Sequence, residues 1–350
     1  MSTSATAPPD AAGPFVQQMD ASDLSDHVRG GTAPPLGSVL VLAGGLTHER
    51  DVSLRSGRRV ADALRARGID AVLRDTDERL LPALLADPPD AVLIALHGGD
   101  GEDGSVRGVL TLARVPYVGS LPGPCRLAFD KPAAKAVLAA AGLATPAAVT
   151  LPAATFRELG AERLLDQLVE GLGLPLMVKP ARGGSALGAT HVTRREQLPE
   201  AMVSCFSYGE DALVERWVEG TELAVSVVDT GAGPHALPAV EIVVRDGGPY
   251  DYEARYTAGE TDFFAPARLP AALLDRAAAA AVRAHEALGL RDLSRADLVV
   301  DAGGDVHLLE VNVSPGLTET SLLPMALAAA GLDLGALCVD LLQQAAARRS

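Results

Sequence analysis

Residues 174–188 read LPLMVKPARGGSALG, an apolar run that ends in a lysine and a proline and continues into a glycine-rich loop. The apolar run predicts a short β-strand, and Pro180 with the glycines behind it predicts a turn. Lys179 places a compact ammonium beside backbone that can approach a ligand closely. This combination is typical of a loop that holds phosphate oxygens.

The surroundings of this loop predict a small lobe of their own. Strands are expected at residues 190–193 and 212–218, with a helix at residues 196–206 between them and another at residues 130–141. The unit is too small for a complete doubly wound domain, so we interpret it as an inserted lobe.

Upstream, the chain alternates between strand and helix. The expected strands are SVLVLAGG at 38–45, AVLRD at 71–75 and AVLIALHG at 91–98, and the helices follow them at 53–67, 80–86 and 105–114. Such alternation predicts a parallel sheet flanked by helices. Ligands gather at the carboxyl ends of such strands, which makes residues 44–51 and 97–104 candidate site loops.

Downstream, we expect strands at 221–229, 236–244, 296–301 and 306–312, and helices at 271–288, 321–330 and 334–347. No repeat of fixed period is present. Residues 1–36 mix proline, glycine, alanine, serine and aspartate without period, which predicts a disordered tail.

Composition excludes several classes of function. The 350 residues carry a formal net charge of −15, which weighs against nucleic acid or an anionic membrane as a partner. The three cysteines form no CxxC pair, and the first residues show no secretory signal, so we expect a cytoplasmic protein. Residues 136–156 carry no charge, but prolines and a glycine divide them, so a membrane span is not expected.

Lysine usage is the first chemical signal. Of the 30 basic residues 27 are arginine, and the three lysines are Lys131, Lys135 and Lys179. Lys131 at a helix start and Lys179 beside its loop could together hold a polyphosphate, with chance surface positions as the alternative. No lysine follows a glycine, which excludes a Walker A loop. The GxGxxG match at 99–104 is rejected because its acidic residues would repel a pyrophosphate.

Asp297, Glu310 and Asn312 are the second signal. Glu310 and Asn312 lie two apart on an expected strand and project from one face, and Asp297 lies on the neighbouring strand. Mg²⁺ is typically held by one or two carboxylates together with substrate phosphates. The alternative is that Glu310 is a strand-end residue that faces water.

The third signal is the segment 246–266, which holds five of the 12 aromatic residues of the chain. A polar, glycine-flanked loop of this composition predicts a lid over a site. A small satellite core beneath a long loop is the alternative.

Together these residues resemble the D-alanine:D-alanine ligases of the ATP-grasp superfamily. The resemblance rests on ordered motifs from residue 44 to residue 324: GGLTHERDVSLRSG, ALHGGDGEDG, FDK, MVKPARGGSALG, VERWVEGTE, YDYEARY, SRADLVVD and LLEVNVSPGLTETSLLP. It implies an α/β fold with α+β lobes: a Rossmann-like parallel-sheet domain at 37–129, a central ATP-grasp lobe at 130–222, and a mixed-sheet lobe at 223–350 that carries the lid loop 246–266. It also implies a homodimer in the cytoplasm.

By the same resemblance, ATP and D-alanine are the substrates, and two Mg²⁺ ions, or Mn²⁺ in their place, are the cofactors of a ligase that works through an acyl phosphate. The residues implied for ATP are Lys131, Lys179, Glu215, Trp217, Val218 and Glu222. Those implied for metal are Asp297, Glu310 and Asn312. Those implied for D-alanine and catalysis are Glu49, His97, Ser185, Arg255, Tyr256, Arg295, Gly316, Ser321 and Leu322.

The sequence departs from the family pattern in three places. Ala186 stands where the family usually has serine, Gly183 where some members have glutamate, and Arg255 where lysine is common. A paralogue that joins another D-amino acid or a D-hydroxy acid is one alternative function. A silent nucleotide-binding paralogue is the other, although a binder has no need of Arg295 as an oxyanion donor.

Overall fold

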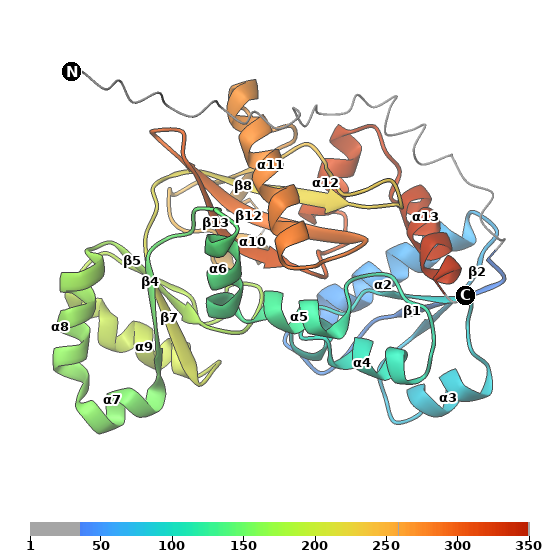
Figure 1. Cartoon of the computed structure of the whole chain (residues 1–350), viewed down its shortest axis with the longest axis horizontal. Helices are drawn as coiled ribbons and strands as arrows, with labels where there is room; N and C mark the ends of the chain where they lie inside the picture. The colour runs from blue at the N-terminus through green and yellow to red at the C-terminus, as the bar shows by residue number, and fades with distance from the viewer. Residues whose placement is uncertain (1–35, 258, 349–350) are drawn as a thin grey trace, which may run out of the picture.

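The computed structural model describes residues 36–257 and 259–348, so the expected tail at 1–36 lies, apart from Leu36, outside the described residues. Three sheets follow one another along the chain, as the colours of Figure 1 show. The first is parallel, and the other two are antiparallel.

The first sheet has the order β2-β1-β3, built from Asp70–Arg74, Ser38–Leu42 and Ala91–Ile94. The central strand β1 is buried on both faces: Val39 and Val41 enter one hydrophobic core, and Leu40 and Leu42 enter another. A strand between two cores is the expected state of a parallel sheet covered by helices. The covering helices are α2 (Arg50–Arg65), α3 (Leu80–Ala86) and α4 (Ser105–Leu112).

The second sheet has the order β4-β7-β5-β6, built from Ala148–Pro152, Asp211–Arg216, Leu176–Pro180 and Thr190–Val192. Figure 1 shows it at the far end of the molecule with helices α7 (Ala153–Leu159), α8 (Ala161–Leu172) and α9 (Leu198–Phe206) beside it. Leucines of α8 and α9 pack with Leu176, Val178 and Val214 in a core of this lobe alone. The lobe therefore presents its other face to the rest of the chain.

The third sheet has the order β11-β10-β8-β12-β13, with β9 beside β8. The strands are β8 (Gly220–Val228), β9 (His235–Ala236), β10 (Val240–Val244), β11 (Thr261–Phe264), β12 (Leu293–Asp301) and β13 (Val306–Asn312). Every described pair of neighbouring strands in this sheet is antiparallel, so the expectation of a mixed sheet was wrong in this detail.

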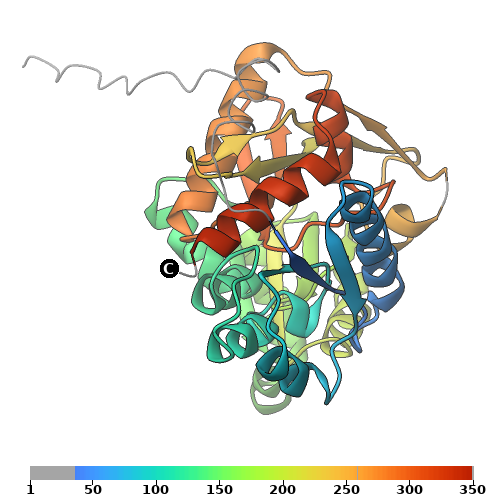
Figure 2. The same cartoon turned by 90° about the vertical axis from the view of Figure 1, so that its right-hand side faces the viewer.

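Helices cover both faces of this third sheet. Helix α11 (Ala271–Ala287) lies on one face, joined by α5 (Pro122–Phe129) and α6 (Lys131–Ala140). Helices α12 (Leu322–Ala329) and α13 (Leu334–Ala347) lie on the other and share a core with β1 and α2. Figure 2 shows α13 running between the parallel sheet and the C-terminal sheet. The C-terminal lobe is thus packed firmly onto the first unit.

Residues 246–266 are not one continuous loop. They contain α10 (Tyr252–Tyr256) and strand β11, whose Phe263 pairs with Ile242 and packs against the shared core. The expected strand at 236–244 is divided into β9 and β10. Alternation of apolar residues could not show either break, because pairing partners far along the chain decide where a strand ends.

None of the described helices is by itself long and apolar enough to cross a membrane, and only the pair α12 and α13, bent by 104°, passes that test in combination. The uncharged residues 136–156 are divided among α6, β4 and α7.

Gly57 provides a test of the packing between α2 and the parallel sheet. A Cβ there would overlap Ala43 and lie 2.9 Å from Leu73 Cδ1, so we expect Gly57→Ala to lower stability by about 1–3 kcal/mol. The matched control is Gly108→Ala in α4, where no atom lies within 4 Å of the added Cβ. That change should stabilise by about 0.5–1 kcal/mol, as alanine favours helix over glycine. Thermal unfolding midpoints that move in the same direction for both variants would contradict this account.

Candidate active site

Two cavities with common lining residues lie where the three units meet. The larger, of about 550 Å³, separates the central sheet from the C-terminal sheet, and the smaller, of about 110 Å³, lies between the C-terminal lobe and the first unit. Gly184, Tyr250 and Arg255 line both. The larger one contains Lys131, Lys179, Glu215, Trp217, Val218, Glu222, Asp297 and Glu310. The smaller one contains Glu49, His97, Ser185, Tyr256, Arg295, Asn312, Gly316, Ser321 and Leu322. Every site residue predicted from the sequence therefore lines one of the two.

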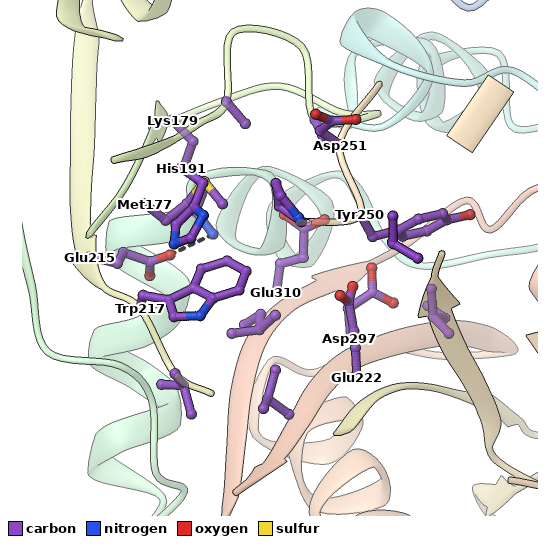
Figure 3. A pocket seen from close by; sticks show the side chains of 18 of the residues that line it. Met177, Lys179, His191, Glu215, Trp217, Glu222, Tyr250, Asp251, Asp297 and Glu310 are labelled. Carbon is purple, nitrogen blue, oxygen red and sulfur yellow. Dashed lines mark ion pairs between the residues drawn. The ribbon is translucent and has the colours of Figure 1, made fainter. Parts of the chain in front are cut away.

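Glu215 holds two of the three lysines at the back of the larger cavity. Its carboxylate oxygens lie 2.6 Å from Lys135 Nζ and 2.6 Å from Lys179 Nζ (Figure 3 labels Lys179 and Glu215). Burial alone would raise the pKa of Glu215, but the two ammonium groups lower it, so the carboxylate stays charged. We expected Glu215 to border the adenine. The structure adds that its charge is already paired.

Lys135 is a residue that sequence reasoning missed. It was one of only three lysines, yet without a neighbouring motif it received no role. It lies on α6, one turn after Lys131, and is buried. All three lysines are therefore largely enclosed and paired with carboxylates, which argues against chance surface positions.

Lys131 connects the glycine-rich loop to β13. Its Nζ donates to the carbonyl oxygen of Gly183 at 2.6 Å and lies 3.6 Å from Glu310 Oε2. Burial would raise the pKa of Glu310, but Lys131 and Lys179 together lower it to about 2. Glu310 is thus an anion at neutral pH, inside a cavity that also carries cations.

Four charged or polar side chains share one face of the C-terminal sheet. On β12 and β13, Arg295 pairs with Asn312 and Asp297 pairs with Glu310. Cross-strand partners project from the same face, which confirms the arrangement read from the sequence. Arg295 also donates to both oxygens of Asp297, at 2.7 and 2.8 Å, so the guanidinium lies beside the oxygen cluster.

These oxygens suit magnesium only in part. Among the described residues no group of three or more His, Cys, Asp and Glu forms a protein-only metal site. Asp297 and Glu310 line the larger cavity, and Asn312 lines the smaller one. Two carboxylates and an amide match Mg²⁺, which takes its remaining oxygen ligands from substrate phosphates and water. The donor set fits the ion on that condition.

An aromatic pocket closes one side of the larger cavity, with Met177, His191 and Trp217 drawn together in Figure 3. The His191 and Trp217 rings lie 4.2 Å apart between centroids. Burial raises the pKa of Glu222, across the cavity, to about 7. An aromatic pocket with a carboxyl group across the cavity is suited to a nucleotide base and its sugar.

The smaller cavity is organised around Ser185. Its Oγ donates to Glu49 Oε1 and lies 2.8 Å from the hydroxyl of Tyr256, so these three residues, all implied by the family resemblance, form one hydrogen-bonded group. A Cβ on Gly98 would overlap the Glu49 carboxylate, and one on Gly184 would lie 3.0 Å from it. The absence of a side chain at these two positions leaves room for the Glu49 carboxylate in its present place.

Glu102 is a second carboxyl that sequence reasoning missed. It accepts from the backbone N–H of Gly98 at 3.0 Å and lines the smaller cavity. Burial and the charge of Glu49 raise its pKa to about 7. Its loop, 97–104, was identified as a site loop, but its acids were considered only as an argument against a pyrophosphate.

At the far wall, the turn before α12 brings Gly316, Ser321 and Leu322 together. Ser321 Oγ accepts from the Thr318 N–H at 3.1 Å and lies 2.8 Å from the Thr318 hydroxyl. Leu322 is buried in the core shared with the parallel sheet. The turn thus offers hydroxyls and backbone above an apolar floor.

Two family patterns match this chain: the D-ala D-ala ligase C-terminus over residues 137–343 and the D-ala D-ala ligase N-terminus over residues 76–120. The chain belongs to the D-alanine:D-alanine ligase family. A D-alanine–D-alanine ligase of Bordetella petrii is 44% identical over 316 residues, which are 90% of this chain and 94% of that protein.

Solved structures of this ligase family agree. The D-alanine–D-alanine ligase from Bacillus anthracis complexed with ATP has 28% identity and a TM-score of 0.72, with 89% of this chain and 98% of that one covered. The VanG D-Ala:D-Ser ligase from Enterococcus faecalis has 26% identity and a TM-score of 0.75, with 89% and 100% covered. The ATP-grasp fold that the motifs implied is confirmed.

Glu215→Gln tests the buried lysine pair. Removing the shared anion leaves two buried ammonium groups uncompensated, which typically costs about 3–5 kcal/mol. Because the pKa of Glu215 is lowered by folding, its contribution is present above its unfolded pKa and is lost as pH falls through the lower folded value. The unfolding midpoint of the variant should therefore lie far below wild type at pH 7 and approach it below about pH 4.

Glu219→Gln, which makes the same charge change at an exposed position, is the control and should leave the midpoint nearly unchanged. Equal effects of the two substitutions at pH 7 would contradict the buried pairing.

Proposed function

We propose that this chain joins two D-alanines into D-alanyl-D-alanine and converts ATP to ADP and phosphate, as a step in the supply of peptidoglycan precursors. One observation carries the proposal: a cavity with cationic side chains and the carboxylates of Asp297 and Glu310 meets, at Gly184, Tyr250 and Arg255, a second cavity lined by the Glu49 carboxylate. Membership of the ligase family supports it.

In the larger cavity we assign the phosphates of ATP to Lys131 and Lys179, and the adenine to the slot beside Trp217 and Val218. Glu222 takes the ribose hydroxyls. Glu215 contributes by orienting Lys179, to which it is paired. Gly183 and Ala186 line the cavity without polar side chains, so the loop contributes mainly backbone there.

Asp297, Glu310 and Asn312 are the residues that would hold Mg²⁺, or Mn²⁺ in its place. When bound, these ions offset the negative charge of the transferred phosphoryl group. Lys131, 3.6 Å from Glu310, and Lys179 add to that neutralisation.

The first D-alanine lies in the smaller cavity. Its ammonium is bound by Glu49, and His97 lies nearby. Its carboxylate oxygen attacks the γ-phosphorus of ATP. A P–O bond forms between that oxygen and the γ-phosphorus, while the bond from the γ-phosphorus to the β-phosphate oxygen breaks. The products of this step are ADP and the acyl phosphate of the first D-alanine. Phosphorylation is needed because a carboxylate is itself a poor electrophile.

The second D-alanine lies by Ser321 and Leu322, with its carboxylate toward the serine. Its ammonium first loses a proton, and the resulting amine forms the C–N bond at the carbonyl carbon of the acyl phosphate and then releases a second proton. The resulting oxyanion is stabilised by Arg295 and the Gly316 N–H, and phosphate then leaves. Arg295 is held in place by its two bonds to Asp297.

The segment 246–266 serves as the lid that protects the acyl phosphate from water. Tyr250 and Arg255 line both cavities, and the Arg255 guanidinium lies 4.3 Å from the Tyr250 ring centroid. Tyr256 reaches Ser185 of the central lobe. We retain the limits 37–129, 130–222 and 223–350 for the three units, and a cytoplasmic homodimer, as further parts of the proposal.

Glu310→Gln should abolish turnover while the fold is retained. The substitution removes one anionic oxygen ligand and leaves the amide unable to offset metal charge. D-alanine-dependent phosphate release from ATP, with the unfolding midpoint measured alongside, checks this. Phosphate release at the wild-type rate would remove Glu310 from the metal site.

The second substrate should be D-alanine rather than D-lactate at neutral pH. An α-amino group titrates near pH 8, so dipeptide formation should rise between about pH 6 and 9. Leu322 gives the pocket an apolar floor that favours a methyl side chain, although such a pocket rejects the hydroxymethyl of D-serine by only about a hundredfold.

Phosphate release over a panel of D-amino and D-hydroxy acids, with products identified by mass, tests this assignment. With equal D-alanine and D-lactate at pH 7, the ester as main product would contradict it.

A further inference from the structure

Helix α2 carries a row of polar side chains on the face that meets the active site. Ser53, Ser56 and Arg59 are spaced three residues apart and so lie along one side of the helix. The two serines are fully buried. A buried hydroxyl needs partners, and the partners of this row lie on three different loops.

His97 is protonated on one nitrogen only, and the structure decides which. Its Nδ1 lies 3.1 Å from the carbonyl oxygen of Ser314, and a carbonyl can only accept, so Nδ1 carries the proton. Burial lowers the pKa of His97 to about 4, which leaves the ring neutral at pH 7. Nε2 is then an acceptor.

The direction of the Ser56 hydroxyl follows from this tautomer. Ser56 Oγ lies 3.0 Å from His97 Nε2 and must donate to it. Its lone pairs remain available, and one accepts the backbone N–H of Leu317 at 3.3 Å. A single hydroxyl therefore joins the loop after β3, through His97, to the turn that carries Gly316.

Arg59, one helical turn further, holds the same segment from the same side. Its Nη1 donates to the carbonyl oxygens of Leu317 and Thr318, at 2.9 and 2.7 Å. The N–H and C=O of Leu317 and the C=O of Thr318 are thus all bonded to α2. The three consecutive peptide groups that follow Gly316 are therefore each bonded to the same helix.

We infer that Ser56, supported by Arg59, is a positioning residue that sets the second D-alanine subsite relative to the first. Glu49, assigned to the first ammonium, is the residue just before α2, and the same helix bonds the turn that carries Gly316 and leads to Ser321. The helix acts as a fixed spacer between the two subsites. This inference rests on the proposed function.

The competing explanation is that Ser56 contributes to stability alone, and Ser53 is the matched control for it. Ser53 is equally buried and also makes two bonds, accepting from the Gly44 N–H and donating to the Ala95 carbonyl, each at 2.8 Å. Both partners of Ser53 belong to the first unit. Its loss should cost stability without moving the turn at 316–318.

The test measures the KM for each D-alanine in Ser56→Ala and Ser53→Ala, by dipeptide formation at saturating ATP. Loss of one buried hydroxyl with two partners should raise the KM of the second D-alanine about tenfold in Ser56→Ala. Ser53→Ala should leave that KM within about twofold, at a comparable loss in unfolding midpoint. Equal effects on the second KM would overturn the inference.

Arg59→Met is a second variant that tests the inference even if Ser56→Ala fails to fold. Arg59 is partly exposed, so its replacement should leave the protein folded. It should raise the second KM several-fold with little change in the first. A second KM unchanged in this variant would also count against the spacer.

Nitrogen chemical shifts of histidine-labelled protein supply a readout that needs no activity. His97 should show the Nδ1–H tautomer at pH 7.5, with its Nε2 resonance shifted in Ser56→Ala and unmoved in Ser53→Ala. An Nε2–H tautomer would overturn the hydrogen-bond chain. Wild-type protein that makes no dipeptide but shows these shifts would instead refute the proposed function and leave the chain of bonds intact.

Discussion

A single hydroxyl, that of Ser185, joins the three units of this protein. It donates to Glu49 at the start of α2 and meets Tyr256 of α10, across 136 and 71 residues of chain. The loop that carries it adopts left-handed backbone at Ser185 and Ala186, φ 51° and 56°, which is costly for residues with a Cβ. The contact places the glycine-rich loop over both cavities and lets them share a boundary. A route from a nucleotide to an amino acid depends on that boundary.

Charge balance is the second constraint. The larger cavity contains carboxylates suited to a metal and ammonium groups suited to phosphates, and each group affects the others. Glu310 stays ionised because lysines surround it, and Lys179 keeps a raised pKa because Glu215 and Glu310 outweigh the effect of its burial. A chain that otherwise uses arginine retains lysine here, where we propose that compact ammonium groups meet the phosphates.

Much of this was predictable from the sequence. Strand β13 begins and ends where expected, and the pairing of Asp297 with Glu310 follows from side-chain alternation. The division of 246–266 into helix and strand and the roles of Lys135 and Glu102 were not. Each depends on contacts between distant segments. Lys135 forms an ion pair with Glu215, 80 positions later, and the charge of Glu49 raises the pKa of Glu102. The tautomer of His97 likewise requires the Ser314 carbonyl, which no local pattern places beside it.

We propose that a phosphoryl group crosses the boundary between the two cavities, from the nucleotide to the carboxylate of the first D-alanine. The amine of the second D-alanine attacks that activated carboxyl group afterwards. The most direct measurement follows ¹⁸O from the carboxylate of labelled D-alanine during turnover with ATP. The account predicts one ¹⁸O in each inorganic phosphate released and one lost from each dipeptide formed, with ADP as the nucleotide product. Phosphate free of label beside a formed dipeptide, or AMP in place of ADP, would contradict it.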